Sequence, residues 1–280
     1  MRPLFNIPGE GAFPFVMGLI SGYPVGAKIV SDFVNKGIST KEEAERMLAF
    51  TNNSGPLFII GTVGVTLFKN TSIGILLFIT HILASITVGI LLNLFNKSKK
   101  NYAKKFEENC STSNKKNSYS VHNKPIHFST IGDILRNSIT NSISTILMIG
   151  GFVVIFSVLL SILNKSYILN IIGNILSPIF NLIHIPANFI TPFLSGIIEL
   201  TNGVSLISNI TVKSLTNSIL LSAFLLGFGG ISILLQVFSI VSKSGLSMNK
   251  YVVGKFLQGI IAVIYTFFAI KIFPFLSFII

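Results

Sequence analysis

The chain has 280 residues, of which half are hydrophobic and 11% are charged, whereas a soluble domain carries about 25% charged residues. This composition excludes an ordinary soluble protein and predicts an all-α, polytopic membrane protein. The formal net charge of +12 does not indicate nucleic-acid binding, because much of it lies in one polar linker and in short loops, as the positive-inside rule predicts. The single cysteine excludes an internal disulfide framework.

The first unusual segment comprises residues 13–33, which are apolar but interrupted by Gly22, Pro24 and Gly26. Such turn chemistry in the middle of an apolar segment is not typical of a simple membrane span. Irregular backbone at membrane depth is tolerated only against protein or a water-filled cavity. We therefore expect a re-entrant helical hairpin or a discontinuous helix here.

Longer apolar segments follow at five places. A membrane helix needs about 20 mostly apolar residues. The five predicted spans are residues 47–68, 70–96, 137–164, 214–242 and 251–274. Residues 166–186 are also apolar, but they contain Pro178, His184 and Pro186, which favours an interfacial or broken helix.

A polar stretch, residues 97–130, divides the chain. It holds eight lysines and two glutamates and is rich in Asn and Ser, which is typical of a flexible linker. Its basic character predicts a cytoplasmic position. We therefore expect a first unit at 1–96, the linker at 97–130 and a second unit at 131–280.

The second unit contains another broken segment, residues 189–210, which is interrupted by Asn202 and Gly203 and carries Glu199. The two broken segments align. The matched pairs at an offset of 178 are Pro8 with Pro186, Pro14-Phe15 with Pro192-Phe193, and Gly18 with Gly196. At an offset of 174 the matched pairs are Ala49-Phe50 with Ala223-Phe224, Gly55 with Gly229, and Lys69 with Lys243.

The aligned segments predict a duplication with inverted repeats. Three predicted spans lie between the two broken segments, and an odd number of spans reverses the direction of the chain. Transporters often use inverted repeats in which broken helices hold the substrate near the midplane. We expect the first hairpin to enter from the cytoplasm and the second from the opposite face.

The predicted repeats differ in length. The second has a span and a connecting segment before its broken element, whereas the first has only residues 1–12 in that place. Three explanations are open: a misassigned start, a fragment of a longer protein, or a reduced architecture. We expect one of the first two.

Glu199 and Lys28 are the candidate charged ligands within the broken segments. The carboxylate of Glu199 is predicted to bind a cation, a proton or the substrate, and the alternative is a tie between helices. Lys28 follows a break where a helix start attracts anions, so it is predicted to bind an anionic substrate. The alternatives for Lys28 are that it extends to the membrane surface or pairs with Asp32.

Small polar residues and flexible backbone at the two broken segments, and a polar cluster inside the predicted span at 47–68, are predicted to line the substrate path. For the cluster the alternative is packing and hydrogen bonding between helices. The candidate substrate-binding residues, together with Lys28, are Ser21, Gly22, Tyr23, Gly26, Thr51, Asn52, Asn53, Ser54, Thr201 and Asn202. His81, Gln236 and Gln258 are expected to be structural. No nucleophile–base set, metal-ligand spacing or phosphate loop occurs in the sequence, so we predict no enzyme activity, no cofactor and no metal.

Four sequence runs resemble a known family. The runs MRPLFNIPGEGAF, GLISGYPVGAK, AERMLAFTNNSGPLFIIGTVG and SGIIELTNG are similar to the YlbJ family of sporulation integral membrane proteins. That family is part of the nucleoside-recognition, or Gate, group, which is related to concentrative nucleoside transporters. The resemblance covers nearly the whole chain except the linker. Members of the family usually start well upstream of the Met1 of this chain.

The resemblance implies export of dipicolinic acid, a small planar dianion, from the mother cell across the outer forespore membrane during sporulation. Lys28, helix starts and amide or hydroxyl donors suit such an anion, whereas Glu199 suits a proton or a cation. The alternatives are a non-transporting scaffold for spore-envelope assembly and a nucleoside transporter. The expected partners are a small-molecule anion, the lipid bilayer and, as an option, further copies in a homo-oligomer; nucleic acid is not expected.

Overall fold

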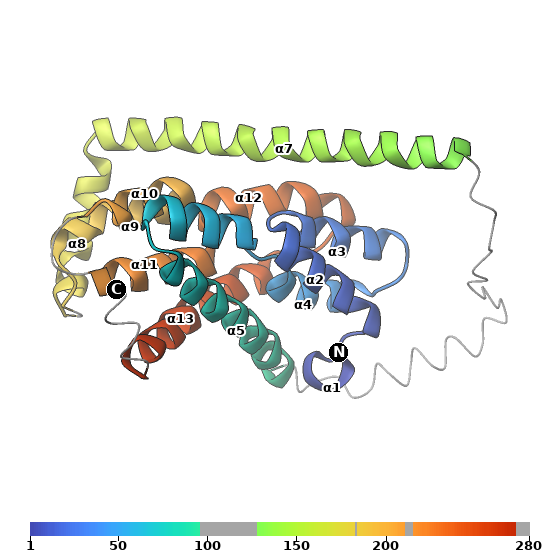
Figure 1. Cartoon of the computed structure of the whole chain (residues 1–280), viewed down its shortest axis with the longest axis horizontal. Coiled ribbons are helices and arrows are strands. Elements are labelled where there is room, and N and C mark those ends of the chain that lie inside the picture. Colours follow the sequence, from blue (N-terminus) through green and yellow to red (C-terminus); the bar gives the residue numbers. More distant parts are fainter. Residues whose placement is uncertain (96–127, 183, 211–214, 273–280) are drawn as a thin grey trace.

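The computed structural model describes residues 1–95, 128–182, 184–210 and 215–272, and every regular element in these ranges is a helix. The predicted all-α fold is therefore confirmed. The linker expected at 97–130 falls almost wholly outside the described residues. Figure 1 shows the helices coloured along the sequence, with α7 lying along one side of the other helices.

The first part of the chain begins with two short helical turns. Two helix pairs, each interrupted by a break, and one long helix follow. Its elements are α1 (Arg2–Phe5), η1 (Gly9–Gly11), α2 (Ala12–Ser21), α3 (Val25–Asn35), α4 (Lys41–Thr51), η2 (Leu57–Leu67) and α5 (Thr71–Phe95). Helices α2 and α3 pack against each other, with a break at Gly22–Pro24 between them. The predicted interruption of residues 13–33 is therefore confirmed.

The second part consists of a long helix, a shorter helix, two helix pairs that are each separated by a break, and a final helix. Its elements are α7 (Phe128–Lys165), α8 (Ile168–Leu182), η3 (Ala187–Phe189), α9 (Ile190–Ile198), α10 (Leu200–Ser208), α11 (Leu215–Phe228), α12 (Gly230–Val241), η4 (Ser242–Ser244) and α13 (Asn249–Ile272). The proline predicted to disturb residues 166–186, Pro178, lies inside α8.

In the part of the chain that the structure describes, four helical segments are long and apolar enough to cross a membrane, where five spans were predicted. They are Thr71–Leu94, Ile131–Lys165, Leu215–Ser244 and Asn249–Ile272. The prediction of an unbroken span at 47–68 is wrong, because α4 ends at Thr51 and η2, which has the wider π-helical winding, starts only at Leu57. Pro56 cannot donate a helical hydrogen bond, and the preceding Asn and Ser side chains compete for backbone groups.

Helix α7 is unlike the others in length and exposure. Its 38 residues extend over about 57 Å, well beyond the roughly 30 Å of a bilayer core. Most of its large apolar side chains are exposed, while its inner side contacts α8, α9 and α12. Exposed apolar side chains over such a length fit contact with lipid.

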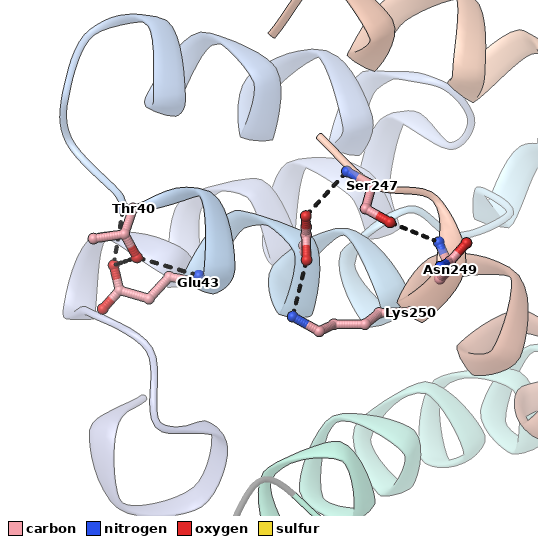
Figure 2. A network of polar contacts seen from close by, with 6 residues as sticks. Thr40, Glu43, Ser247, Asn249 and Lys250 are labelled. Atoms are coloured by element: carbon pink, nitrogen blue, oxygen red, sulfur yellow. Dashed lines mark hydrogen bonds and ion pairs between the residues drawn. The ribbon is translucent and has the colours of Figure 1, made fainter. Parts of the chain in front are cut away.

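Polar contacts fix α4 to the start of α13. In the capping box of α4, Glu43 N donates to Thr40 Oγ1 over 3.3 Å and Thr40 N donates to Glu43 Oε2 over 3.0 Å (Figure 2). On the next turn, Glu45 accepts from Lys250 Nζ at 2.9 Å and from Ser247 N at 3.0 Å. The beginning of α4 and the beginning of α13 therefore lie at the same end of the molecule.

Close backbone approaches hold the broken helices together. Gly18 and Gly26 both pack directly against the carbonyl of Thr51, where a methyl group would clash. Gly203 packs in the same manner on Gly196. Small residues allow this approach, which is a common way to pack helices in membranes. The helices of the two hairpins therefore pack at close backbone distance, which holds their breaks in place.

Candidate functional site

Four interruptions in the helices define the candidate site. Gly22, with φ of 77°, ends α2, and residues 52–55 form an extended stretch between α4 and η2. Glu199 is extended, with φ of −138° and ψ of 117°, and separates α9 from α10. Gly229 and Gly230, with φ of 88° and 82°, separate α11 from α12. Both halves of the chain therefore contribute two breaks.

Three of the four breaks line one cavity of about 240 Å³. Its walls come from the α2–α3 turn, the 52–55 stretch and η2, the α9–α10 break, α7 and α12. The lining residues are Gly22, Tyr23, Ser54, Gly55, Phe58, Ile149, Val153, Glu199, Leu200, Thr201, Ile233 and Gln236. The fourth break, at Gly229 and Gly230, does not line the cavity. It is connected to the cavity wall through Tyr23, whose hydroxyl donates to the carbonyl of Leu226, near the end of α11, over 3.3 Å.

Glu199 lies in the cavity wall as the N-cap of α10. Its carboxylate accepts from Thr201 N at 3.0 Å and from Asn202 N at 2.7 Å, and the side chain is 3% exposed. The backbone N–H groups of a helix start stabilise a carboxylate placed in this way. The break was predicted at Asn202 and Gly203, and this is wrong: both residues lie within α10, because the capping acid, rather than the glycine, ends the preceding helix.

A buried polar cluster lies behind the cavity wall. It joins the 52–55 stretch to α13 and consists of Asn53, Lys255 and Gln258. Lys255 Nζ donates to Gln258 Oε1 at 2.8 Å and to Asn53 Oδ1 at 3.4 Å, and Gln258 Nε2 donates to the same Asn53 oxygen at 2.9 Å. All three side chains are fully buried. We call this set the Lys255 cluster.

Two further contacts extend the hold on the 52–55 stretch. Asn52 Nδ2 donates to the Tyr251 hydroxyl over 2.8 Å, and Ser54 N donates to His81 Nε2 over 3.4 Å. Asn52 Oδ1 and His81 Nδ1 are buried and have no hydrogen-bond partner in the part of the chain that the structure describes. The stretch is therefore held by side chains from α5 and α13, and it retains unused hydrogen-bonding capacity.

The structure brings some of the predicted substrate ligands to the cavity. Gly22, Tyr23, Ser54 and Thr201 line it, together with Glu199. Other candidates lie next to it with side chains engaged elsewhere. Asn52 and Asn53 bond to residues of α13, Asn202 Nδ2 donates to Ser157 Oγ on α7 at 2.9 Å, and Thr51 is buried with its carbonyl against Gly18 and Gly26.

The remaining candidates are farther from the cavity lining. Ser21 is exposed, and Gly26 is used for packing. Lys28 is partly buried on α3 and is not among the lining residues. Its predicted role as the anion ligand has no support from the position of the side chain, and it stays a prediction.

The sequence interpretation missed the most deeply buried cation. Lys255, Gln258 and Tyr251 lie three and four residues apart on α13, which places them on one helix face. That spacing, with a lysine well inside the predicted span at 251–274, was the available signal. Gln258 was expected to be structural, and its partners show that it orients Asn53 and Lys255 instead of packing alone.

Comparison with known proteins gives one curated relative and one family. Over 266 residues the chain is 34% identical to the sporulation integral membrane protein YlbJ of Bacillus subtilis strain 168, covering 95% of this chain and 65% of that protein. The chain thus spans just under two thirds of the length of this relative. Residues 146–247 match the family described as Gate, nucleoside recognition. No solved structure matches. These findings confirm the resemblance drawn from the sequence.

Proposed function

Because this chain is a relative of the YlbJ sporulation membrane proteins and carries a Gate match, we propose that it is a non-enzymatic transporter of a small organic anion. The proposed substrate is dipicolinate, exported from the mother cell across the outer forespore membrane during sporulation. The proposed binding site is the 240 Å³ cavity among the helix breaks.

The observation that carries this proposal is the meeting of helix breaks from both halves around one cavity. Broken helices at membrane depth are tolerated where they line a cavity. They expose backbone groups and helix ends to a bound molecule, as in secondary transporters. A scaffold protein has no need for several breaks that meet at one point.

An inverted repeat fits this arrangement. The order of a broken pair (α2–α3), a broken helix (α4–η2) and a long helix (α5) recurs as α9–α10, α11–α12 and α13. Hydrogen bonding between the hydroxyls of Ser31 and Ser244 joins the end of the first hairpin to the turn before α13. In the proposed topology this end is cytoplasmic and the second hairpin enters from the opposite face.

The chemistry of the cavity supports a small substrate with polar edges. Its volume lies below the roughly 300–1,000 Å³ of sites for drug-sized ligands. The aromatic rings of Tyr23 and Phe58 offer flat apolar surface, and the polar side chains of Ser54, Thr201 and Gln236 offer hydrogen bonds. A planar aromatic dicarboxylate matches this combination.

The test in cells is deletion of the gene in the sporulating host. The expected result is that dipicolinate is made but does not reach the spore, and normal spore loading would overturn the proposal. The test in vitro is uptake of radiolabelled dipicolinate by proteoliposomes containing the full chain. Empty liposomes, and liposomes holding heat-denatured protein, provide the baseline.

A nucleoside transporter is the second candidate, and the Gate description favours it. Parallel uptake of radiolabelled nucleosides in the same proteoliposomes separates the two substrates. A non-transporting scaffold is the third candidate. It predicts no uptake of either compound, and normal spores with Lys28→Ala and Glu199→Gln.

A further inference from the structure

Lys255 is a buried cation at the point where the first half of the chain meets the last helix. Its side chain has no exposed surface, and its ammonium donates to the amide oxygens of Asn53 and Gln258. The ammonium also lies 5.4 Å from the ring centroid of Tyr23 and 5.8 Å from that of Tyr251. All these partners are formally neutral.

No carboxylate balances this charge. Among residues 1–95, 128–182, 184–210 and 215–272, no Asp or Glu lies within the 4.0 Å of an ion pair with Lys255 Nζ. The titratable groups that face Lys255 are Tyr23 from the α2–α3 turn, His81 from α5, and Tyr251 from its own helix. Helix α11 contributes no ionisable residue, and α4 leads into the neutral Asn52 and Asn53.

The ammonium contacts two residues that line the cavity or adjoin its lining. Tyr23 lines the cavity and presents its ring to Lys255. Asn53, which accepts from the ammonium, immediately precedes Ser54, which also lines the cavity. The carboxylate of Glu199 lies in the same cavity wall but is already engaged by two backbone N–H groups. Tyr23 and the Asn53–Ser54 peptide therefore connect the cavity to a buried ammonium that has no ion-pair partner among the described residues.

We propose that Lys255 is the proton-carrying residue that couples anion occupancy of the cavity to the proton gradient. This inference rests on the proposed transport of an anion. In the loaded state the amine is an ammonium, holds the 52–55 stretch through Asn53 and balances the charge of the anion. When the anion leaves, the ammonium N–H bond breaks, the electron pair stays on nitrogen, and the proton passes to water that enters the cavity. One proton thus moves with each anion.

A purely structural role does not explain a lysine at this position. An ionisable group inside a membrane is costly unless it is compensated, and such groups are rare and typically serve proton or substrate pathways. A hydrogen-bond tie between α13 and Asn53 is already supplied by Gln258. The lysine adds a charge that can be gained and lost, and the amide cannot supply one.

The test uses the full chain in proteoliposomes, with dipicolinate uptake measured at equal pH on both sides and with the outside more acidic. For the wild-type protein we expect the gradient to stimulate uptake. In Lys255→Met the stimulation should disappear and uptake should fall about tenfold or more, the change that 1.4 kcal/mol of lost interaction produces. Lys255→Arg keeps a fixed charge, so it should bind dipicolinate without responding to the gradient.

Lys271→Met is the matched control. Lys271 is on the same helix but exposed, with its ammonium 4.5 Å from the Phe267 ring centroid, and this variant should keep the wild-type response. Wild-type uptake that ignores pH, or a Lys255→Met protein that keeps the gradient response, overturns the inference while leaving anion transport intact. No uptake by the wild-type protein under any gradient overturns the proposed function, and the inference with it.

Discussion

The helix break between α4 and η2 and the break between α11 and α12 have similar places in the two halves but different chemistry. In the first, residues 52–55 are polar and are held by side chains from α5 and α13. In the second, Gly229 and Gly230 interrupt the helix through positive φ values of 88° and 82°. One break depends on distant partners and the other depends on its own backbone.

This difference teaches which break is suited to change during a transport cycle. A stretch held by hydrogen bonds from other helices can be loosened when one partner changes its charge or moves. A glycine pair in the left-handed region carries little strain, and its conformation does not depend on hydrogen bonds from distant side chains. We therefore expect substitutions of polar partners to act mainly through the first break, and added side chains to act mainly through the second.

The largest expected effect is that of Asn53→Leu. This substitution removes the oxygen that accepts from both Lys255 and Gln258. Breaking a buried charged network by removing one partner costs about 3–5 kcal/mol, so the free energy of unfolding should fall by about that amount. It is measured by denaturant titration in mixed micelles. Asn209→Leu, at an exposed amide on the C-cap of α10, should change little. Equal losses of stability in both variants would contradict the view that the first break depends on its buried partners on α13.

The next effect comes from Gly230→Ala in the second break. Gly230 has φ of 82°, and an added methyl carbon would lie 3.0 Å from the Gly196 carbonyl oxygen. A left-handed backbone costs an L-residue about 1–2 kcal/mol, so the same unfolding measurement should show at least that loss. The control, Gly61→Ala in η2, meets only a leucine methyl group at 3.6 Å and should be neutral or slightly stabilising. A stable Gly230→Ala protein would show that the second break is not fixed by its glycines.

Glu199→Gln tests the break in the second hairpin with a smaller expected effect. Both carboxylate oxygens of Glu199 accept backbone hydrogen bonds, and a glutamine has only one oxygen to offer. Loss of one capping bond costs about 1 kcal/mol. Glu43→Gln is the control, because Glu43 caps α4 on the exposed surface. A thermal-shift assay should place the melting temperature of Glu199→Gln below that of Glu43→Gln, and the reverse order would contradict a buried capping role.

Composition and turn residues predicted much of the fold. The low charge content predicted a membrane protein, and Gly22 with Pro24 correctly marked the break in the first hairpin. The break within 47–68 was not predicted, although its polar residues were noted. The hydropathy averaged over about 20 residues stays apolar across the four-residue interruption at 52–55. Hydropathy does not report where backbone hydrogen bonds are lost.

The candidate site was only partly predictable, because its key contacts join residues about 200 positions apart. Tyr23 and Glu199 were found from their places in broken segments, and Ser54 was found from a polar cluster inside a predicted span. Lys255 was not, because its segment has no interruption and its partner Asn53 lies in the other half of the chain. Only the folded arrangement reveals which polar residues of uninterrupted helices face a break.

The smallest expected effect sharpens the comparison, because it concerns a second connection between the same two elements. Glu45 and Lys250 join α4 to α13 near the surface, with side chains 15% and 38% exposed. Exposed ion pairs contribute about 0.2–1 kcal/mol and are screened by salt. A double-mutant cycle with Glu45→Gln and Lys250→Met should therefore give a coupling energy in that range that shrinks as ionic strength rises. The cycle of Asn53→Leu with Lys255→Met should give a larger coupling that salt does not change, because both side chains are fully buried and dissolved ions do not screen them. If both cycles responded equally to salt, the 52–55 stretch would be open to solvent, and the two breaks would no longer differ in how they are held.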